Sequence, residues 1–168
     1  EVDKQPSAAR IILDQGYTII DGGKAIGSRH LVVTQQAQTL SVDEEATLTA
    51  CGVLELDSTV DYSLSGDAPE VLRAKMKVKS GGNPVLTGSV VFSGAEATVA
   101  WTSDSGRGGT LKTPSKQTAT VKVPPGPIVF GSTLEAVGPL LLRDDGEREV
   151  VWIEFDDSSK GSLVEFKA

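Results

Sequence analysis

The residues that most often carry chemistry are scarce in this chain, which has one histidine and one cysteine among 168 residues. An imidazole base would have to be His30, but residues 28–32 alternate like a strand and lack the Gly-x-Ser-x-Gly motif of a serine nucleophile. Residues 48–51 imitate a lipoprotein processing site ending at Cys51, yet no hydrophobic run precedes them. One histidine and one cysteine are too few for a Cys/His zinc site. We therefore expect no metal, no cofactor and no nucleophilic catalysis.

Acidic residues offer the next candidate chemistry. The acidic strings at 144–147 and 156–159 contain oxygen ligands for Ca²⁺, but neither has the spacing of a calcium loop. Asp, Gly and Ser are also typical of exposed turns, which is the favoured interpretation. The chain has 23 acidic residues, so a hydrolase that uses two carboxylates stays an alternative, and it predicts two buried acids in one cleft.

Two segments have features of anion-binding sites. Residues 105–110 are glycine-rich, but an extended segment and not a helix follows them, so a hairpin loop is favoured over a phosphate site. Four basic residues alternate along one predicted strand: Arg73, Lys75, Lys77 and Lys79. The net charge of -7 disfavours nucleic acid as the main partner of either segment.

The basic row has a structural explanation in the pairing of neighbouring strands. If the turn closes with Ser65 opposite Val71, Asp61 lies opposite Lys75 on the same face. In that register Asp57 lies opposite Lys79. We therefore expect a solvated face of opposite charges, with a binding role as the alternative.

The elements that must position these residues are strands, because apolar and polar residues alternate with a period of two along most of the chain. The alternation from Ala46 to Ser65 predicts one long strand, bent at Gly52. Further strands are predicted at 17–20, 28–40, 72–78, 85–92, 95–101, 118–123, 149–155 and 162–166. Short Gly, Ser, Asp or Pro breaks separate many of them, which favours an antiparallel meander over βαβ units.

The sequence predicts one short helix, near residues 132–142. Ser132 to Glu135 form a capping-box string, and Pro139 should end the helix after a turn or two. A chain of this length holds about one core, so residues 1–168 are expected to form a single, mainly β domain. Its antiparallel meander would form a curved sheet, a half-barrel or a sandwich. The chain begins without Met, which suggests either a processed protein or the N-terminal part of a longer one.

Residues 17–28 resemble the opening of a group of secreted bacterial envelope proteins, in which a short strand, a glycine turn and an Ile-Gly step lead into a long strand. Residues 21–23 supply positive φ angles cheaply, and Gly27 permits a bulge. Residues 124–127 resemble the same group's break before its covering helix. The layout is also similar to lipoprotein-localisation-factor carriers, whose curved antiparallel sheet forms a half-barrel over an apolar cavity, although this chain has one helix where the carriers have several.

This resemblance implies an extracytoplasmic protein, in the periplasm or at the cell surface after signal removal, and it carries over no catalytic residues. The leading hypothesis is a non-catalytic cell-envelope protein that binds an apolar ligand, such as a lipid, or an envelope partner on a concave sheet face. The expected lining residues, for each of which a plain core position is the favoured alternative, are Leu72, Met76, Val90, Phe92, Val99, Trp101 and Phe130. A structural or accessory subunit of a cell-surface assembly is the alternative. No run approaches 18 apolar residues, so the chain is not expected to span a membrane.

Overall fold

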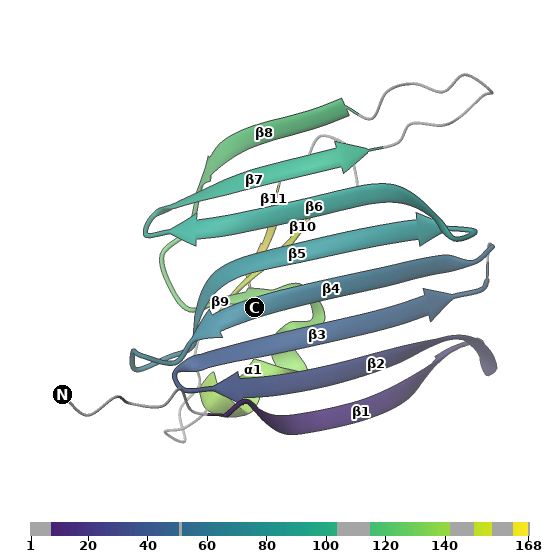
Figure 1. The fold of residues 1–168 in the computed structure, drawn as a ribbon, viewed down its shortest axis with the longest axis horizontal. Helices are drawn as coiled ribbons and strands as arrows, with labels where there is room; N and C mark the ends of the chain where they lie inside the picture. The colour runs from purple at the N-terminus through teal and green to yellow at the C-terminus, as the bar shows by residue number, and fades with distance from the viewer. Residues whose placement is uncertain (1–7, 51, 104–114, 142–149, 156–162, 168) are drawn as a thin grey trace.

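A computed structural model describes residues 8–50, 52–103, 115–141, 150–155 and 163–167 of the chain. Its main feature is one eight-stranded antiparallel sheet in which each strand pairs with its neighbours in sequence (Figure 1). The strands are β1 (Arg10–Asp21), β2 (Lys24–Gln36), β3 (Thr39–Leu48), β4 (Leu54–Ser63), β5 (Glu70–Ser80), β6 (Asn83–Ser93), β7 (Glu96–Ser103) and β8 (Ser115–Lys122). β1 and β8 are its two edges, so the predicted meander is confirmed as an open, curved sheet.

A smaller covering layer lies behind the sheet in the view of Figure 1. It comprises β9 (Ile128–Phe130), the 3₁₀ turn η1 (Gly131–Thr133), α1 (Leu134–Leu141), β10 (Val151–Phe155) and β11 (Leu163–Lys167). The predicted helix is confirmed, and it ends two residues beyond Pro139. β9 pairs in parallel with β10, which an all-antiparallel meander did not predict. A strand of three residues is too short to show a periodic pattern.

The face of the eight-stranded sheet that carries this layer is called the inner face. Residues paired directly across antiparallel strands share a face, so the register assigns the odd residues of β2 and the even residues of β3 to it. The core forms where those side chains meet the covering layer. Its most buried members are Leu31, Val33, Leu40, Val42, Tyr62, Val90, Val99, Val129 and Val137.

Two predicted strands are wrong because each contains a chain reversal. Residues 28–40 divide at Ala37, whose φ of 51° closes the turn between β2 and β3. Residues 46–65 divide between Leu48 and Leu54, which lie opposite each other in the β3–β4 pair. Because the two leucines have the same parity, the alternation continues through the reversal and hides it.

The predicted pairing between β4 and β5 is wrong by two residues. Asp61 lies opposite Arg73, and Lys75 lies opposite Thr59. A bulge beyond Asp61 brings Tyr62, and not the predicted Ser65, opposite Val71. The expected neutralisation of charge is still present on this outer face. Arg73 Nε donates to Asp61 Oδ2 at 2.5 Å, and Lys79 Nζ lies 3.0 Å from Asp57 Oδ2 and 3.5 Å from Glu55 Oε2.

The observed register predicts which charges are coupled. In a double-mutant cycle, Asp61→Asn and Arg73→Gln should show a coupling free energy of about 0.5–1 kcal/mol, because the two side chains form a hydrogen-bonded ion pair. The matched cycle of Asp61→Asn with Lys75→Gln should give a value near zero, since Lys75 faces Thr59. Urea unfolding measures both. A larger coupling to Lys75 would support the register predicted from sequence.

Gly27 lies where β2 comes unusually close to β3. The predicted bulge is confirmed here, because Ile19 pairs with Gly27 whereas Ile20 pairs with Ala25. A Cβ added at Gly27 would lie 2.1 Å from the carbonyl oxygen of Thr47. No side chain fits without a shift of the β3 backbone.

We expect Gly27→Ala to lower the free energy of unfolding by at least about 1–3 kcal/mol, because the clash involves backbone and cannot relax cheaply. Gly16→Ala in β1 is the control, since a Cβ there meets nothing within 4 Å and its φ is not positive. The control should leave the unfolding midpoint nearly unchanged. Equal effects of the two substitutions would contradict the close approach.

Candidate functional site

A cavity of about 340 Å³ lies between the inner face and the covering layer. Leu56, Val60 and Met76 line it from β4 and β5, and Phe130 and Thr133 line it from the covering layer. Its polar lining includes Ser58, Lys75 of β5 and two carboxylates, Glu44 of β3 and Glu154 of β10. The cavity is therefore an apolar space with a few polar and charged groups at its walls, which is the usual composition of a small-molecule site.

One wall of the cavity is fixed by the hydroxyl of Tyr62, which is fully buried in β4. Thr133 Oγ1 donates to the carbonyl of Phe130 at 2.7 Å, so the Tyr62 hydroxyl donates to Thr133 Oγ1, 2.5 Å away. The same hydroxyl accepts the Phe130 N–H at 3.1 Å. Burial raises the pKa of Tyr62 above its ordinary 10.0, and the Phe130 N–H that donates to its hydroxyl oxygen lowers it by less. The network ties η1 and β9 to the sheet.

A charged cluster joins the same two layers next to the cavity. Arg29 Nε donates to Glu44 Oε1 at 2.6 Å, and an Arg29 terminal nitrogen lies 3.0 Å from Glu135 Oε2 of α1. The guanidinium also lies 5.5 Å from the ring centre of Tyr17. Burial lowers the pKa of Arg29, but its contacts with Glu44 and Glu135 outweigh burial and raise it.

Two carboxylates in one cleft are what the hydrolase alternative predicts, but Glu44 has structural partners. Besides its ion pair with Arg29, its second oxygen accepts a hydrogen bond from Ser58 Oγ at 3.4 Å. A carboxylate held on both oxygens is an anchor for the arginine. This arrangement gives Glu44 a positioning role beside the cavity.

The inner face continues beyond the covering layer. At the covered ends of the strands, Leu40, Val42 and Tyr62 are fully buried. At the opposite ends, Leu48 and Leu54 are 39% and 40% exposed. The half-buried members of this open end are Ile19, Ala46, Leu56, Met76, Val78 and Leu86. Leu56 and Met76 of this group also line the cavity, which therefore lies at the boundary between the covered and open ends.

The seven residues predicted from sequence fall into three groups. Met76 and Phe130 line the cavity, Phe130 from the covering layer. Val90, Val99 and Trp101 lie within the core. Leu72 and Phe92 line a second cavity.

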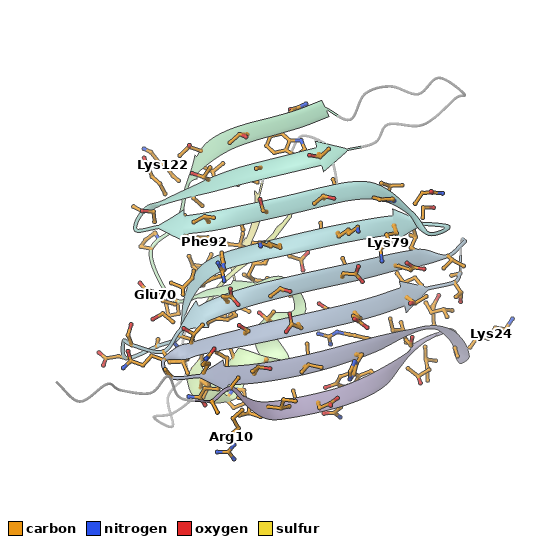
Figure 2. All side chains as sticks on the ribbon, in the orientation of Figure 1. Arg10, Lys24, Glu70, Lys79, Phe92 and Lys122 are labelled. Carbon is orange, nitrogen blue, oxygen red and sulfur yellow. The ribbon has the colours of Figure 1, made fainter. Side chains whose placement is uncertain are left out.

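Leu72 and Phe92 line a second cavity of about 510 Å³ at the end of the sheet, together with residues 123–126. Figure 2 shows Phe92 and Glu70 at this end. Leu72 lies at the β5 bulge and is 40% exposed, whereas Phe92 packs edge-on against Phe130 with ring centres 6.2 Å apart. Leu72 therefore lies apart from the cavity that holds Met76.

The other chemical candidates lie away from both cavities. His30 Nε2 lies 2.7 Å from Asp14 Oδ1 on the exposed outer face, and no hydroxyl among the described residues is hydrogen-bonded to the imidazole. The same part of the chain contains no cluster of three or more His, Cys, Asp or Glu able to hold a metal ion. None of its helices is long and apolar enough to cross a membrane. Cys51, the 105–110 loop and the acidic strings at 144–147 and 156–159 lie outside the described residues.

The sequence reasoning missed Arg29 and Glu44, although a signal for both was present. Arg29 has the parity of Leu31 and Val33, and Glu44 has the parity of Leu40 and Val42. A charge at an inward position predicts a buried partner of opposite charge.

The chain folds as an open antiparallel sheet with a partly covered apolar face and a cavity beneath the cover. Comparison with known proteins found no matching family model, no matching curated protein and no matching solved structure.

The Tyr62 network predicts a loss of stability in alkali. Because the pKa of Tyr62 is higher in the folded than in the unfolded protein, its contribution is complete below about pH 10 and disappears as pH rises through the folded value. Tyr62→Phe should cost about 1–3 kcal/mol at neutral pH, since it leaves a buried N–H without its acceptor, and should flatten the alkaline decline. Denaturant unfolding from pH 7 to pH 11 measures both effects. Tyr17→Phe is the control and should cost less at neutral pH; an unchanged alkaline slope in Tyr62→Phe would count against the network.

Proposed function

We propose that this protein is a non-catalytic, extracytoplasmic binder of an apolar ligand, which it holds on the inner face of its sheet. The observation that carries the proposal is the open end of that face, where leucines 39% and 40% exposed continue an otherwise buried apolar surface. Exposed apolar surface next to a cavity is a feature of binding sites. A ligand that enters the cavity and extends along the open end would remove this surface from water.

The dimensions and charges of the site favour a small, uncharged ligand. A volume of about 340 Å³ is at the lower end of the roughly 300–1,000 Å³ found for small-molecule sites, so it suits one alkyl chain and not a bulky lipid. Glu44 is already paired with Arg29, and Lys75 lines the cavity as well as Glu154, so it is the net charge of -7 that disfavours a carboxylate or phosphate headgroup. We therefore propose a single-chain ligand with a neutral head.

A structural or accessory role in a cell-surface assembly is the second candidate. The exposed isoleucines of the edge strand β1 favour it, because an unpaired strand edge can extend a sheet into another protein. The two roles use different surfaces, so each can be tested without the other.

The proposed binding is tested by calorimetric titration with 1-octanol, 1-nonanol and 1-decanol. Each added methylene that becomes buried contributes about 0.8 kcal/mol, so affinity should rise about fourfold per carbon. Decanoate should bind more weakly than 1-decanol, because its ionised carboxylate loses hydration at an apolar wall and approaches a protein of net charge -7. Absence of binding, or affinity that does not depend on chain length, would overturn the proposal.

A matched pair of variants locates the site. Leu56→Trp replaces leucine at the cavity wall by a larger aromatic side chain, which fills part of the cavity. It should weaken 1-decanol binding at least tenfold. Val91→Trp adds the same ring to the outer face, where Val91 is 55% exposed, and should leave binding unchanged. Equal effects of the two variants would move the site away from the inner face.

A further inference from the structure

The two edges of the eight-stranded sheet differ in how they are protected. β8 ends at Lys122, and an edge lysine discourages the addition of another strand. β1 exposes Ile11, Ile12 and Ile20 by 60%, 43% and 64%. The outer side of β1 has no strand partner among the described residues, because β1 pairs with β2 alone.

β1 is also long and regular along most of its length. Its bulge places Ile12 as an extra residue near one end, since Ile11 pairs with Thr34 and Leu13 with Val33. From Leu13 to Ile19 the pairing with β2 has no further irregularity. This regular stretch is centred on Gly16.

The sequence of β1 is complementary to itself in the antiparallel direction. Pairing two copies about Gly16 places Leu13 opposite Ile19 of the second copy on the inner face. Beyond the regular stretch, the bulged pair Ile11 and Ile12 meets Ile20 of the second copy. One step further, Arg10 lies opposite Asp21 of the second copy.

This register matches both apolar surface and charge. The three exposed isoleucines of each copy cover one another, and Arg10 meets an opposite charge at each end of the pair. Figure 2 shows Arg10 at the free edge of the sheet. The remaining charge of the strand, Asp14, lies 2.7 Å from His30 Nε2 of the same copy and would face Thr18 of the second.

We propose that β1 is a dimerisation edge, at which a second copy of this chain adds its own β1 in antiparallel register about Gly16. The two-fold axis lies perpendicular to the sheet, so the contact is self-complementary and closes at two copies. The proposal does not depend on the proposed ligand-binding function, because the inner-face cavity lies on β3 to β5 and the covering layer.

Sedimentation of the full 168-residue chain tests the association directly. From about 1 to about 100 μM we expect a reversible monomer–dimer equilibrium. Ile20→Lys should weaken dimerisation at least tenfold, whereas Val91→Lys, at a similarly exposed site on the central strand β6, should leave it unchanged. A chain that stays monomeric, a dimer indifferent to Ile20→Lys, or open-ended polymers from pairing of β1 with β8 would each overturn the proposal.

A charge exchange tests the register. Arg10→Asp should weaken the dimer several-fold because it faces Asp21 of the second copy with a like charge. Adding Asp21→Arg to the same chain should restore the dimer. The aspartate at position 10 of each copy then faces the arginine at position 21 of the other copy. Weakening without restoration would place the two residues apart and overturn the register.

A disulfide locates the two-fold axis. In a Cys51→Ser background, Gly16→Cys should cross-link two copies, because directly opposed residues have Cα atoms roughly 4.5–5.5 Å apart, within the range of a disulfide. Gly16 tolerates the side chain, since a Cβ there meets nothing within 4 Å. Thr118→Cys on the β8 edge is the control and should stay reduced. Equal cross-linking of the two variants would overturn the assignment to β1.

Discussion

The arrangement of the two layers depends on the buried hydroxyl of Tyr62. A hydroxyl removed from water needs partners, and Tyr62 finds a donor in Phe130 of β9 and an acceptor in Thr133 of η1. β9 begins directly after Pro127, whose carbonyl accepts a hydrogen bond from the Val151 N–H of β10. The start of β9 is therefore held by β10, and its end is held by Tyr62. Apolar contact alone would allow the cover to slide along the sheet, whereas the hydrogen bonds select one position.

That position leaves the sheet covered at one end only. Tyr62 lies near the end of β4, so the cover packs over the ends of the strands around Leu40 and Val71. The opposite ends, near Leu48 and Leu54, continue the same apolar face without a described cover. The Arg29 ion pairs with Glu44 and Glu135 lie between the two regions and fasten α1 beside the boundary. The cavity is thus a consequence of where a hydrogen-bonded cover ends on a longer apolar face.

Alternation predicted the fold class and the faces of most strands, because burial on one side of a sheet imposes a period of two. It predicted the strand ends poorly. The turn at Ala37 lacks glycine and proline, and the reversal between Leu48 and Leu54 preserves parity. The inward position of Glu44 could be predicted, because Glu44 alternates in step with the buried Leu40 and Val42. The contact of Tyr62 with Thr133 could not be predicted. That contact joins residues 71 apart in sequence, and no local pattern encodes such a meeting.

The open inner face and the unprotected β1 edge are related by geometry. A two-fold axis through Gly16 and perpendicular to the sheet keeps the inner faces of both copies on the same side. Pairing through β1 would therefore extend one sheet across two molecules and present both cavities in one direction. The edge residues would be buried while Leu48 and Leu54 stay accessible, because these leucines lie on central strands. Association through the edge and binding in the cavity thus share no residue, because no β1 residue lines the cavity, and a dimer would hold two ligands side by side above one continuous sheet.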